Sequence, residues 1–336
     1  MRPIEIVGGG LAGLALGRAL VARGVEVTLH EALDYPRHRV CGEFMCGLGS
    51  DVVETLGLEP ILQGAVRHRT MAWFRREREV GRSRLPTAAI GLSRLAFDDR
   101  LASDFVAGGG RLRTRSRVGG REDAPGRVWA TGRRAGAGEW IGLKTHCRGL
   151  STCADLDFHL SPGAYVGASK VEDDAVNVCG LFRRRSDVRA AADRVLVEYL
   201  RANGLSTFAG QVEATLVRGA QAAVAALDFA HRHEEGRVVL GDAFGMIPPF
   251  TGNGMAIALE SAALALHPCL EYAQRGIDWD VVVREVELRL RRRFRHRLRL
   301  ARLLQSVMTS GRGQACLALA LRGGFLPFRL LFRQLH

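Results

Sequence analysis

The stretch IEIVGGGLAGLALGRALVAR, residues 4–23, decides the fold. Residues 2–7 form a short apolar run that predicts a buried strand, and residues 11–23 place apolar side chains at helical spacing. Residues 25–30 predict a second strand. A strand, a helix and a second strand in this order form a βαβ unit, so the sequence predicts a doubly wound α/β fold from here onward.

Three glycines stand at the turn from this strand to the helix with the spacing GxGxxG. Gly8 permits a tight turn, Gly10 lets a pyrophosphate approach the backbone, and Gly13 lets the helix and the strand pack closely. The helix start, at Leu11 and Ala12, supplies free N–H groups and a positive partial charge. These features predict a site for the phosphates of a dinucleotide.

Glu31 follows the second strand, 23 residues after Gly8. An acid at this place can accept hydrogen bonds from both hydroxyls of the adenosine ribose, which favours FAD or NAD over NADP. The alternative is a glycine turn in an α/β protein that binds no nucleotide, and the strand, helix and acid around the glycines disfavour it.

A second motif lies far along the chain. A short apolar strand at 237–240 leads into Gly241-Asp242, and the loop PPFTGNGM at 248–255 opens an apolar helix at 253–274. This arrangement predicts a second helix N-terminus that binds anions and carbonyl groups, with Asp242 facing the ligand. The alternative is an ordinary connection in which Asp242 caps a helix.

Composition excludes several classes of protein. The chain of 336 residues carries a net charge of +13, of which residues 284–336 contribute +11, so the charge is no sign of a nucleic-acid-binding body. The seven cysteines have neither zinc spacing nor an even number for a disulfide framework, so we expect a reducing, cytoplasmic compartment and no metal. Neither a signal peptide nor a membrane-spanning run is expected.

The two glycine motifs together resemble the single-dinucleotide FAD-dependent oxidoreductases that share the para-hydroxybenzoate hydroxylase fold, over about residues 1–275. That family includes aromatic hydroxylases, halogenases and geranylgeranyl reductases. The resemblance implies an α/β fold with a discontinuous Rossmann-like FAD-binding domain, an antiparallel β-sheet substrate domain and a helical C-terminal tail. The FAD-binding domain would comprise 1–70, 93–135 and 210–275, the substrate domain 71–92 and 136–209, and the tail 276–336.

The resemblance also implies roles for single residues. In that family the first glycine loop holds the FAD pyrophosphate, the acid matching Glu31 holds the adenosine ribose, and the acid matching Asp242 holds the ribityl chain or the pyrophosphate. Backbone N–H groups of the second helix start face the flavin pyrimidine ring, and a basic residue, here Arg37 or Arg39, follows the second strand. The implied cofactor-binding residues are Gly8, Gly10, Leu11, Ala12, Gly13, Glu31, Arg39, Arg94, Val118, Asp242, Gly252, Asn253, Gly254 and Met255.

The segment Arg39-Val40-Cys41-Gly42-Glu43 resembles a Cys-Gly-Gly/Glu segment of the geranylgeranyl reductase-like branch, where it lies beside the isoalloxazine. Cys41 is therefore a candidate to contact the flavin, although a buried cysteine more often acts as a small apolar side chain. Residues 128–133 lack the Asp of the Asp-Gly fingerprint that many hydroxylases use, so NAD(P)H as a transient reductant is left open. A double-Trp halogenase motif is absent at 163–167.

Residues 93–107 and 187–203 predict helices, and residues 111–118 predict a strand. Residues 140–183 predict several antiparallel strands that cover the flavin and the substrate, and the sequence does not decide which face points inward. The candidates for the inward face are His146, Phe158, Tyr165, Asn177 and Cys179. No catalytic triad or pair of carboxylates is evident, and the histidines are more typical of surface or packing positions. Such a pattern agrees with flavin chemistry, in which the cofactor carries the reaction.

The tail at 284–336 alternates arginines with apolar residues. We expect its first helix to pack on the FAD-binding domain with its arginines in solvent. The alternative is peripheral contact with an anionic membrane or with a carrier protein.

The sequence thus predicts a FAD-dependent oxidoreductase, monooxygenase-like, that acts on an apolar or aromatic small molecule. One alternative is a double-bond reductase similar to geranylgeranyl reductase. Another is a flavin-binding protein that docks on a membrane or a partner without turnover.

Overall fold

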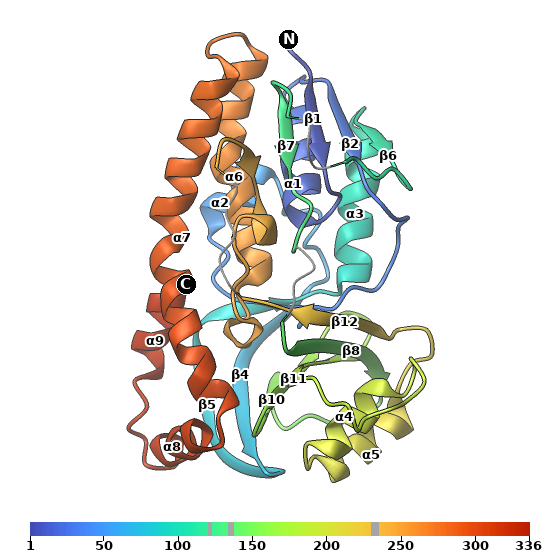
Figure 1. Ribbon diagram of the computed structural model, residues 1–336, viewed down its shortest axis with the longest axis vertical. Coiled ribbons are helices and arrows are strands. Elements are labelled where there is room, and N and C mark those ends of the chain that lie inside the picture. The colour runs from blue at the N-terminus through green and yellow to red at the C-terminus, as the bar shows by residue number, and fades with distance from the viewer. Residues whose placement is uncertain (120–122, 134–137, 230–234) are drawn as a thin grey trace.

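The computed structural model describes residues 1–119, 123–133, 138–229 and 235–336. Two sheets lie one above the other, and a long C-terminal helix runs beside both (Figure 1). Sheet A has five parallel strands in the order β13-β7-β1-β2-β6. Its strands are β1 (Ile4–Val7), β2 (Val27–His30), β6 (Arg111–Arg113), β7 (Arg127–Trp129) and β13 (Val238–Val239).

Sheet B has eight strands in the order β12-β8-β11-β10-β9-β4-β5-β3, and its neighbours pair antiparallel except β4 with β9. The strands are β3 (Phe44–Met45), β4 (Val66–Arg75), β5 (Arg78–Gly91), β8 (Trp140–Arg148), β9 (Leu156–Ser161), β10 (Ala164–Lys170), β11 (Ala175–Arg183) and β12 (Ala222–Leu227). Two helices, α4 (Val195–Ala202) and α5 (Ser206–Thr215), pack on one face of this sheet. The other face turns toward sheet A (Figure 1).

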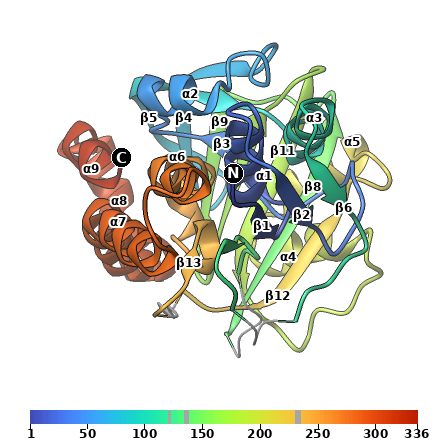
Figure 2. The same ribbon diagram turned by 90° about the horizontal axis from the view of Figure 1, so that it is seen from above.

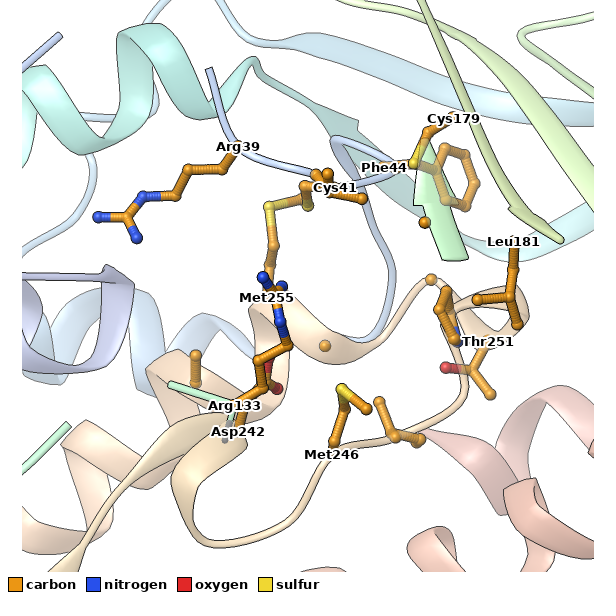
Figure 3. A pocket seen from close by; sticks show the side chains of 18 of the residues that line it. Arg39, Cys41, Phe44, Arg133, Cys179, Leu181, Asp242, Met246, Thr251 and Met255 are labelled. Carbon is orange, nitrogen blue, oxygen red and sulfur yellow. The ribbon is translucent and has the colours of Figure 1, made fainter. Parts of the chain in front are cut away.

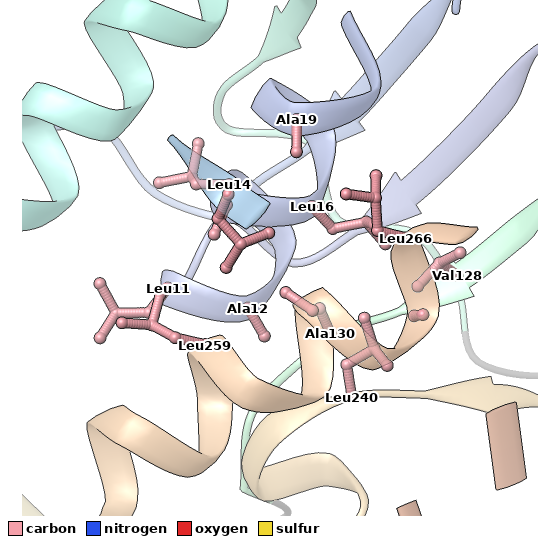
Figure 4. Packing of buried hydrophobic residues seen from close by; sticks show 14 of the residues in the cluster. Leu11, Ala12, Leu14, Leu16, Ala19, Val128, Ala130, Leu240, Leu259 and Leu266 are labelled. Carbon is pink, nitrogen blue, oxygen red and sulfur yellow. The ribbon is translucent and has the colours of Figure 1, made fainter. Parts of the chain in front are cut away.

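The core beside sheet A is built by packing between helices. The glycine-loop helix α1 (Leu11–Val21) contacts both α3 (Arg94–Ala107) and α6 (Gly254–Ala273). Figure 4 shows Leu11, Ala12 and Leu16 of α1 facing Leu259 and Leu266 of α6. Near their starts, Ala12 of α1 and Ala258 of α6 lie on either side of Gly241, and these small residues bring the two starts close together. A short helix, α2 (Ser50–Leu56), also contacts both of them.

Most of the expected elements are present. The helices expected at 93–107 and 253–274 are α3 and α6, and the antiparallel run at 140–183 is β8 to β11. The strand expected at 111–118 ends at Arg113, because the chain turns through Arg115, whose φ is 51°. The helix expected at 187–203 begins only at Val195, because the Arg- and Asp-rich residues before it are exposed and offer no apolar face to the sheet.

The expected boundaries at residues 70 and 210 cut across sheet B. Strand β4 already begins at Val66, and β12 pairs with β8 although it lies inside 210–275. The apolar stretch at 222–227 has no motif that would distinguish an outer strand of sheet B from a part of the nucleotide-binding half.

The tail consists of three helices, α7 (Trp279–Thr309), α8 (Gly311–Arg322) and α9 (Phe328–Leu335). Helix α7 buries one side chain every four residues against the core beside sheet A, namely Val282, Val286, Leu290, Phe294 and Leu298. Figure 2 shows α7 beside α6. The expected packing of the first tail helix is therefore what the structure shows, except that Arg297 is buried and does not lie in solvent. Among the described helices, none is long and apolar enough to cross a membrane.

Two ion pairs connect Glu260 of α6 with α7. Its carboxylate contacts Arg293 at 2.6 Å and the buried Arg297 at 2.9 Å. Because Glu260 and Arg297 are both buried, their ion pair is shielded from water and from salt, whereas Arg293 is about half exposed.

Phe294→Ala tests whether α7 is part of the core. Phe294 is fully buried and its ring lies 6.3 Å from that of Phe244, so its loss leaves a cavity and lowers the free energy of unfolding by about 3–5 kcal/mol. Chemical denaturation measures this change. The control Leu303→Ala, on the same helix at 72% exposure, changes it by less than about 0.5 kcal/mol. Equally small effects of both substitutions would contradict the packing.

Candidate active site

A single cavity of about 1300 Å³ runs from the glycine loop after β1 to the inner face of sheet B. It exceeds the ~300–1,000 Å³ of an ordinary small-ligand pocket, so it has room for a dinucleotide together with a second small molecule. Figure 3 shows Arg133 and Asp242 in its wall, with Cys41 and Met255, and with Cys179 and Leu181 of β11 further along.

Glycine serves a different geometric purpose at each of the three motif positions. Gly8 has φ 113°, and a Cβ there would lie 2.2 Å from the carbonyl oxygen of Ala130. A Cβ on Gly13 would lie 2.0 Å from the carbonyl oxygen of Gly8, so this glycine permits the close approach of α1 to β1. A Cβ on Gly10 would meet no atom within 4 Å, and Gly10 lines the cavity. Its open side is therefore a cradle that a ligand can enter.

Two helix N-termini open into this cavity. Helix α1 begins after Gly10 without a side-chain cap, and its first residues, Leu11 and Ala12, line the cavity. Helix α6 begins after Asn253, also without a side-chain cap, and Gly254 and Met255 line the cavity. Because the first N–H groups of a helix have no partner within it, both ends offer donors and a positive partial charge.

Glu31 lies in the cavity wall within a cationic frame. Its carboxylate accepts hydrogen bonds from the backbone N–H groups of Gly9, at 2.9 Å, and Leu33, at 3.1 Å, and contacts Arg37 at 2.9 Å and Arg39 at 3.3 Å. Burial opposes its ionisation, but the hydrogen bond and charges of the two arginines outweigh burial, so the pKa of Glu31 lies below its ordinary value. The acid is therefore ionised at neutral pH.

Both basic residues suggested by the sequence lie here. Arg37 has a buried nitrogen, Nη1, without a hydrogen-bond partner among the described residues. Arg39 also contacts Asp98 at 2.7 Å, and Arg94 contacts both oxygens of Asp98 at 2.7 Å. An unpartnered guanidinium nitrogen beside a glycine cradle suits an anionic group such as a phosphate.

Asp242 lies in the short 3-10 turn after β13 and opens into the cavity. Burial raises the pKa of its carboxyl, and the charges of Arg94 and Arg133 oppose that rise. Figure 3 shows Arg133 beside it. Sequence analysis did not identify Arg133 as a site residue. It ends the segment 128–133, in which the Asp of the hydroxylase fingerprint is absent.

The opposite end of the cavity is aromatic. The rings of Phe158 and Tyr165 stack at 5.7 Å, Trp73 lies 5.3 Å from Phe158, and Phe250 lies 6.1 Å from Tyr165. All four residues line the cavity. This chamber suits a flat or otherwise apolar ligand.

The structure shows which face of sheet B points inward. Phe158, Tyr165 and Cys179 line the cavity. His146 lies on the same side, but its Nε2 is 2.6 Å from the carboxylate of Glu43, and the amide of Asn177 donates a hydrogen bond to the carbonyl oxygen of Cys41 at 3.0 Å. These two residues therefore hold the 41–43 loop rather than line the chamber.

Much of the apolar wall comes from the tail, which sequence analysis placed outside the site. The end of α7, both later helices and their connection contribute Leu304, Val307, Met308, Cys316, Leu317, Ala320, Leu326, Phe328, Leu331, Phe332, Leu335 and His336. The apolar composition of 315–332 was the available signal, but it did not show which surface these helices cover.

Thirteen of the predicted residues line the cavity, namely Gly8, Gly10, Leu11, Ala12, Glu31, Arg39, Cys41, Arg94, Val118, Asp242, Gly252, Gly254 and Met255. Gly13 lies behind the loop, as its packing role requires. Asn253 does not line the cavity, and its amide instead donates a hydrogen bond to the carbonyl oxygen of Leu335 in α9. Burial raises the pKa of the Cys41 thiol, which favours its protonated form.

One protein family and several solved structures are similar to this chain. The profile of the squalene epoxidase family matches residues 203–287, which contain the second motif. A search of curated proteins finds no significant match.

Solved structures resemble the chain over nearly its whole length. One is HpxO of Klebsiella pneumoniae complexed with FAD and uric acid, with a TM-score of 0.77, 16% identity, and coverage of 98% of this chain and 97% of that one. Another is the p-nitrophenol 4-monooxygenase PnpA of Pseudomonas putida, with a TM-score of 0.76, 14% identity, and coverage of 100% and 96%. A geranylgeranyl bacteriochlorophyll reductase-like protein of Thermoplasma acidophilum has a TM-score of 0.73, 16% identity, and coverage of 95% and 91%.

These matches define the class of fold. The chain has the fold shared by FAD-dependent monooxygenases and geranylgeranyl reductase-like flavoproteins, as the two glycine motifs predicted.

A matched pair of substitutions tests the glycine geometry. Gly13→Ala forces a methyl group against the carbonyl oxygen of Gly8 and lowers the free energy of unfolding by about 1–3 kcal/mol. Gly10→Ala, in the same loop, places its methyl group in open space and changes stability by less than about 0.5 kcal/mol. Thermal and chemical denaturation of both variants measure the difference, and a reversed order would contradict the assigned packing.

Proposed function

We propose that the protein is a FAD-dependent oxidoreductase, monooxygenase-like, that acts on an apolar or aromatic small molecule. One observation carries the proposal, namely that the phosphate cradle at Gly10 and the aromatic chamber at Phe158 and Tyr165 belong to one continuous cavity. A dinucleotide held at the first end extends toward the second, so the reactive ring and the substrate meet inside the protein.

The residues at the nucleotide end fit FAD. The open side of Gly10, the start of α1 and the free nitrogen of Arg37 would hold the pyrophosphate, and the ionised Glu31 would accept hydrogen bonds from the ribose hydroxyls. The start of α6 at Gly254 and Met255 would donate to the carbonyl groups of the flavin ring. When bound, the flavin supplies the redox chemistry, while the chain binds, orients and excludes water.

The proteins of similar fold support an aromatic substrate. The crystallised HpxO complex contains uric acid together with FAD, and PnpA is named for a nitrophenol. The chamber of this chain is walled by Trp73, Phe158, Tyr165 and Phe250, which favours a flat apolar ligand over a strongly charged one.

A reductase is the second candidate. Cys41 and Gly42 line the cavity and the buried Glu43 lies behind them, which supports the proposed likeness to geranylgeranyl reductases, and a reductase-like protein is among the similar structures. In both cases NAD(P)H is the proposed transient reductant, entering the open part of the cavity.

Turnover with and without oxygen tests the proposal. The flavin-loaded protein with an aromatic substrate consumes NAD(P)H rapidly in air and slowly under anaerobic conditions if it is a monooxygenase. Anaerobic reduction of a double bond would favour the reductase. Flavin binding without any turnover across both substrate classes would contradict the proposed activity.

The outer surface of the tail supports a further proposal, peripheral contact with an anionic membrane. Leu303, Leu319, Phe325 and Leu330 are exposed, and residues 288–336 contain arginines but neither Asp nor Glu. Several of these arginines pair with acids of other segments, but the stretch keeps an excess of positive charge, and apolar side chains beside such an excess fit an anionic lipid surface. A cytoplasmic protein that binds a membrane through this surface would reach a lipophilic substrate that is dissolved in the membrane.

Sedimentation with vesicles measures this contact. We expect binding to vesicles of anionic phospholipid, weaker binding at high salt, and a loss of at least about tenfold in Phe325→Ser/Leu330→Ser. Leu288→Ser, also exposed but distant along α7, is the matched control. If the protein stays in solution with anionic vesicles at low salt, the membrane contact is wrong.

A further inference from the structure

Three ionisable side chains are buried together behind the cavity wall. Glu43 follows the Cys41-Gly42 segment, and Lys144 and His146 project from β8 toward it. The lysine Nζ lies 3.0 Å from Oε1 of Glu43, and Nε2 of His146 lies 2.6 Å from Oε2. The side chains of Glu43 and Lys144 have no exposed surface. Sequence analysis missed this cluster, although Lys144 is one of only two lysines in a chain rich in arginine.

Burying such a cluster costs folding free energy, and apolar side chains of similar size could pack there without that cost. Desolvation of a buried ion pair removes most of its Coulombic gain, so packing alone does not explain it. Glu43 also has φ 51°, a left-handed conformation that residues with a Cβ rarely adopt. Its carbonyl oxygen accepts a hydrogen bond from the N–H of Leu92 at 3.3 Å, and its carboxylate Oε1 accepts one from the N–H of Arg94 at 2.9 Å.

The lysine reaches a second partner, which lines the cavity. Nζ of Lys144 lies 3.0 Å from Nδ1 of His38. An ammonium group only donates hydrogen bonds, so Nδ1 must be the acceptor and the ring proton must sit on Nε2. Nε2 has no partner among the described residues, and it lies on the side of the ring away from the buried lysine.

The surroundings also keep this ring neutral. Burial, followed by Lys144 and His146, lowers the pKa of His38 to about 4, and Glu43 opposes them. These are the ionisable groups that face His38 from its own loop and from β8, and the ring of His146 meets it edge-on at 4.9 Å. At neutral pH the ring therefore presents one N–H donor and carries no charge.

We propose that His38 is the hydrogen-bond and proton donor of this cavity, and that Lys144 and Glu43 are positioning residues that fix its donor atom as Nε2. The proposal rests on the proposed function only in naming the flavin and its substrate as the ligands. Both candidate reactions consume protons, because monooxygenation reduces one oxygen atom to water and double-bond reduction adds a proton with each hydride.

Proton delivery through this ring is balanced. His38 releases its Nε2 proton to the ligand and takes a proton at Nδ1 from Lys144, so the ring stays neutral and the lysine becomes neutral. The total charge of the cluster falls by one, and it is restored when the cluster takes a proton from solvent. His146, whose side chain is 10% exposed, lies at the outer end of this chain of contacts.

Long-range proton–nitrogen NMR of histidine-labelled protein tests the assignment without flavin or substrate. His38→Gln identifies the resonance by its absence. We expect Nε2–H for His38 and no titration between pH 5 and 8. Lys144→Met removes the donor and a positive charge, so the pKa of His38 rises toward about 6.5 and both tautomers appear. Lys170→Met, the same change at the other and exposed lysine, leaves the resonance unchanged.

The double variant Glu43→Gln/Lys144→Met serves if the single variant does not fold, because it buries no unpaired charge and predicts the same release of His38. A proton on Nδ1 in the wild type, or a wild-type pKa above 6, overturns the proposal. In the flavin-loaded enzyme, His38→Gln lowers kcat at least about tenfold with little change in KM, and unchanged kcat would overturn the donor role. A protein that shows the expected tautomer yet binds no flavin would contradict the proposed function alone.

Discussion

The constraint on which the rest of this structure depends is the close approach of two helix starts to one cavity. Helix α1 can reach β1 only because Gly13 has no side chain against the backbone of Gly8, and α6 packs against α1 where Gly241 lies between Ala12 of α1 and Ala258 of α6. Since each start leaves N–H groups without partners, their convergence creates a strongly anion-attracting region inside the protein. The charged side chains of Glu31, Arg37 and Asp242 line the cavity around this region. Side chains in place of Gly8 and Gly13 would push α1 away from β1, and the cavity would then lose the N–H donors at the start of α1.

Local patterns in the sequence predicted this end of the site well. The βαβ unit, the acid at Glu31 and the second loop at Asp242 are short motifs whose geometry follows from a few neighbouring residues, so thirteen predicted residues line one cavity, while their contact with a cofactor stays a prediction. Contacts between distant segments were not predictable in the same way. Nothing near Lys144 indicates that it meets His38, because that contact depends on how β8 packs against a loop a hundred residues earlier. The place of β12 in sheet B and the role of the tail depend equally on tertiary packing.

The tail connects the two halves of the molecule. Helix α7 packs on α6 through Phe294 and the Glu260 ion pairs, and its end continues into α8 and α9, whose inner sides complete the aromatic chamber. The amide of Asn253, at the start of α6, contacts α9 directly. One segment thus supports the helix that faces the proposed flavin ring and also walls the space for the substrate. The same helices expose apolar and basic side chains outward, so binding at the surface and access to the chamber would be coupled by geometry.

Titration of the purified protein with FAD, followed by its visible absorption, tests the central claim most directly. The account predicts saturable binding of one FAD per chain, with competition by ADP, because the adenosine end alone uses the cradle at Gly10 and the acid at Glu31. An absorption spectrum that stays that of free FAD at all protein concentrations, in a folded sample, would contradict it.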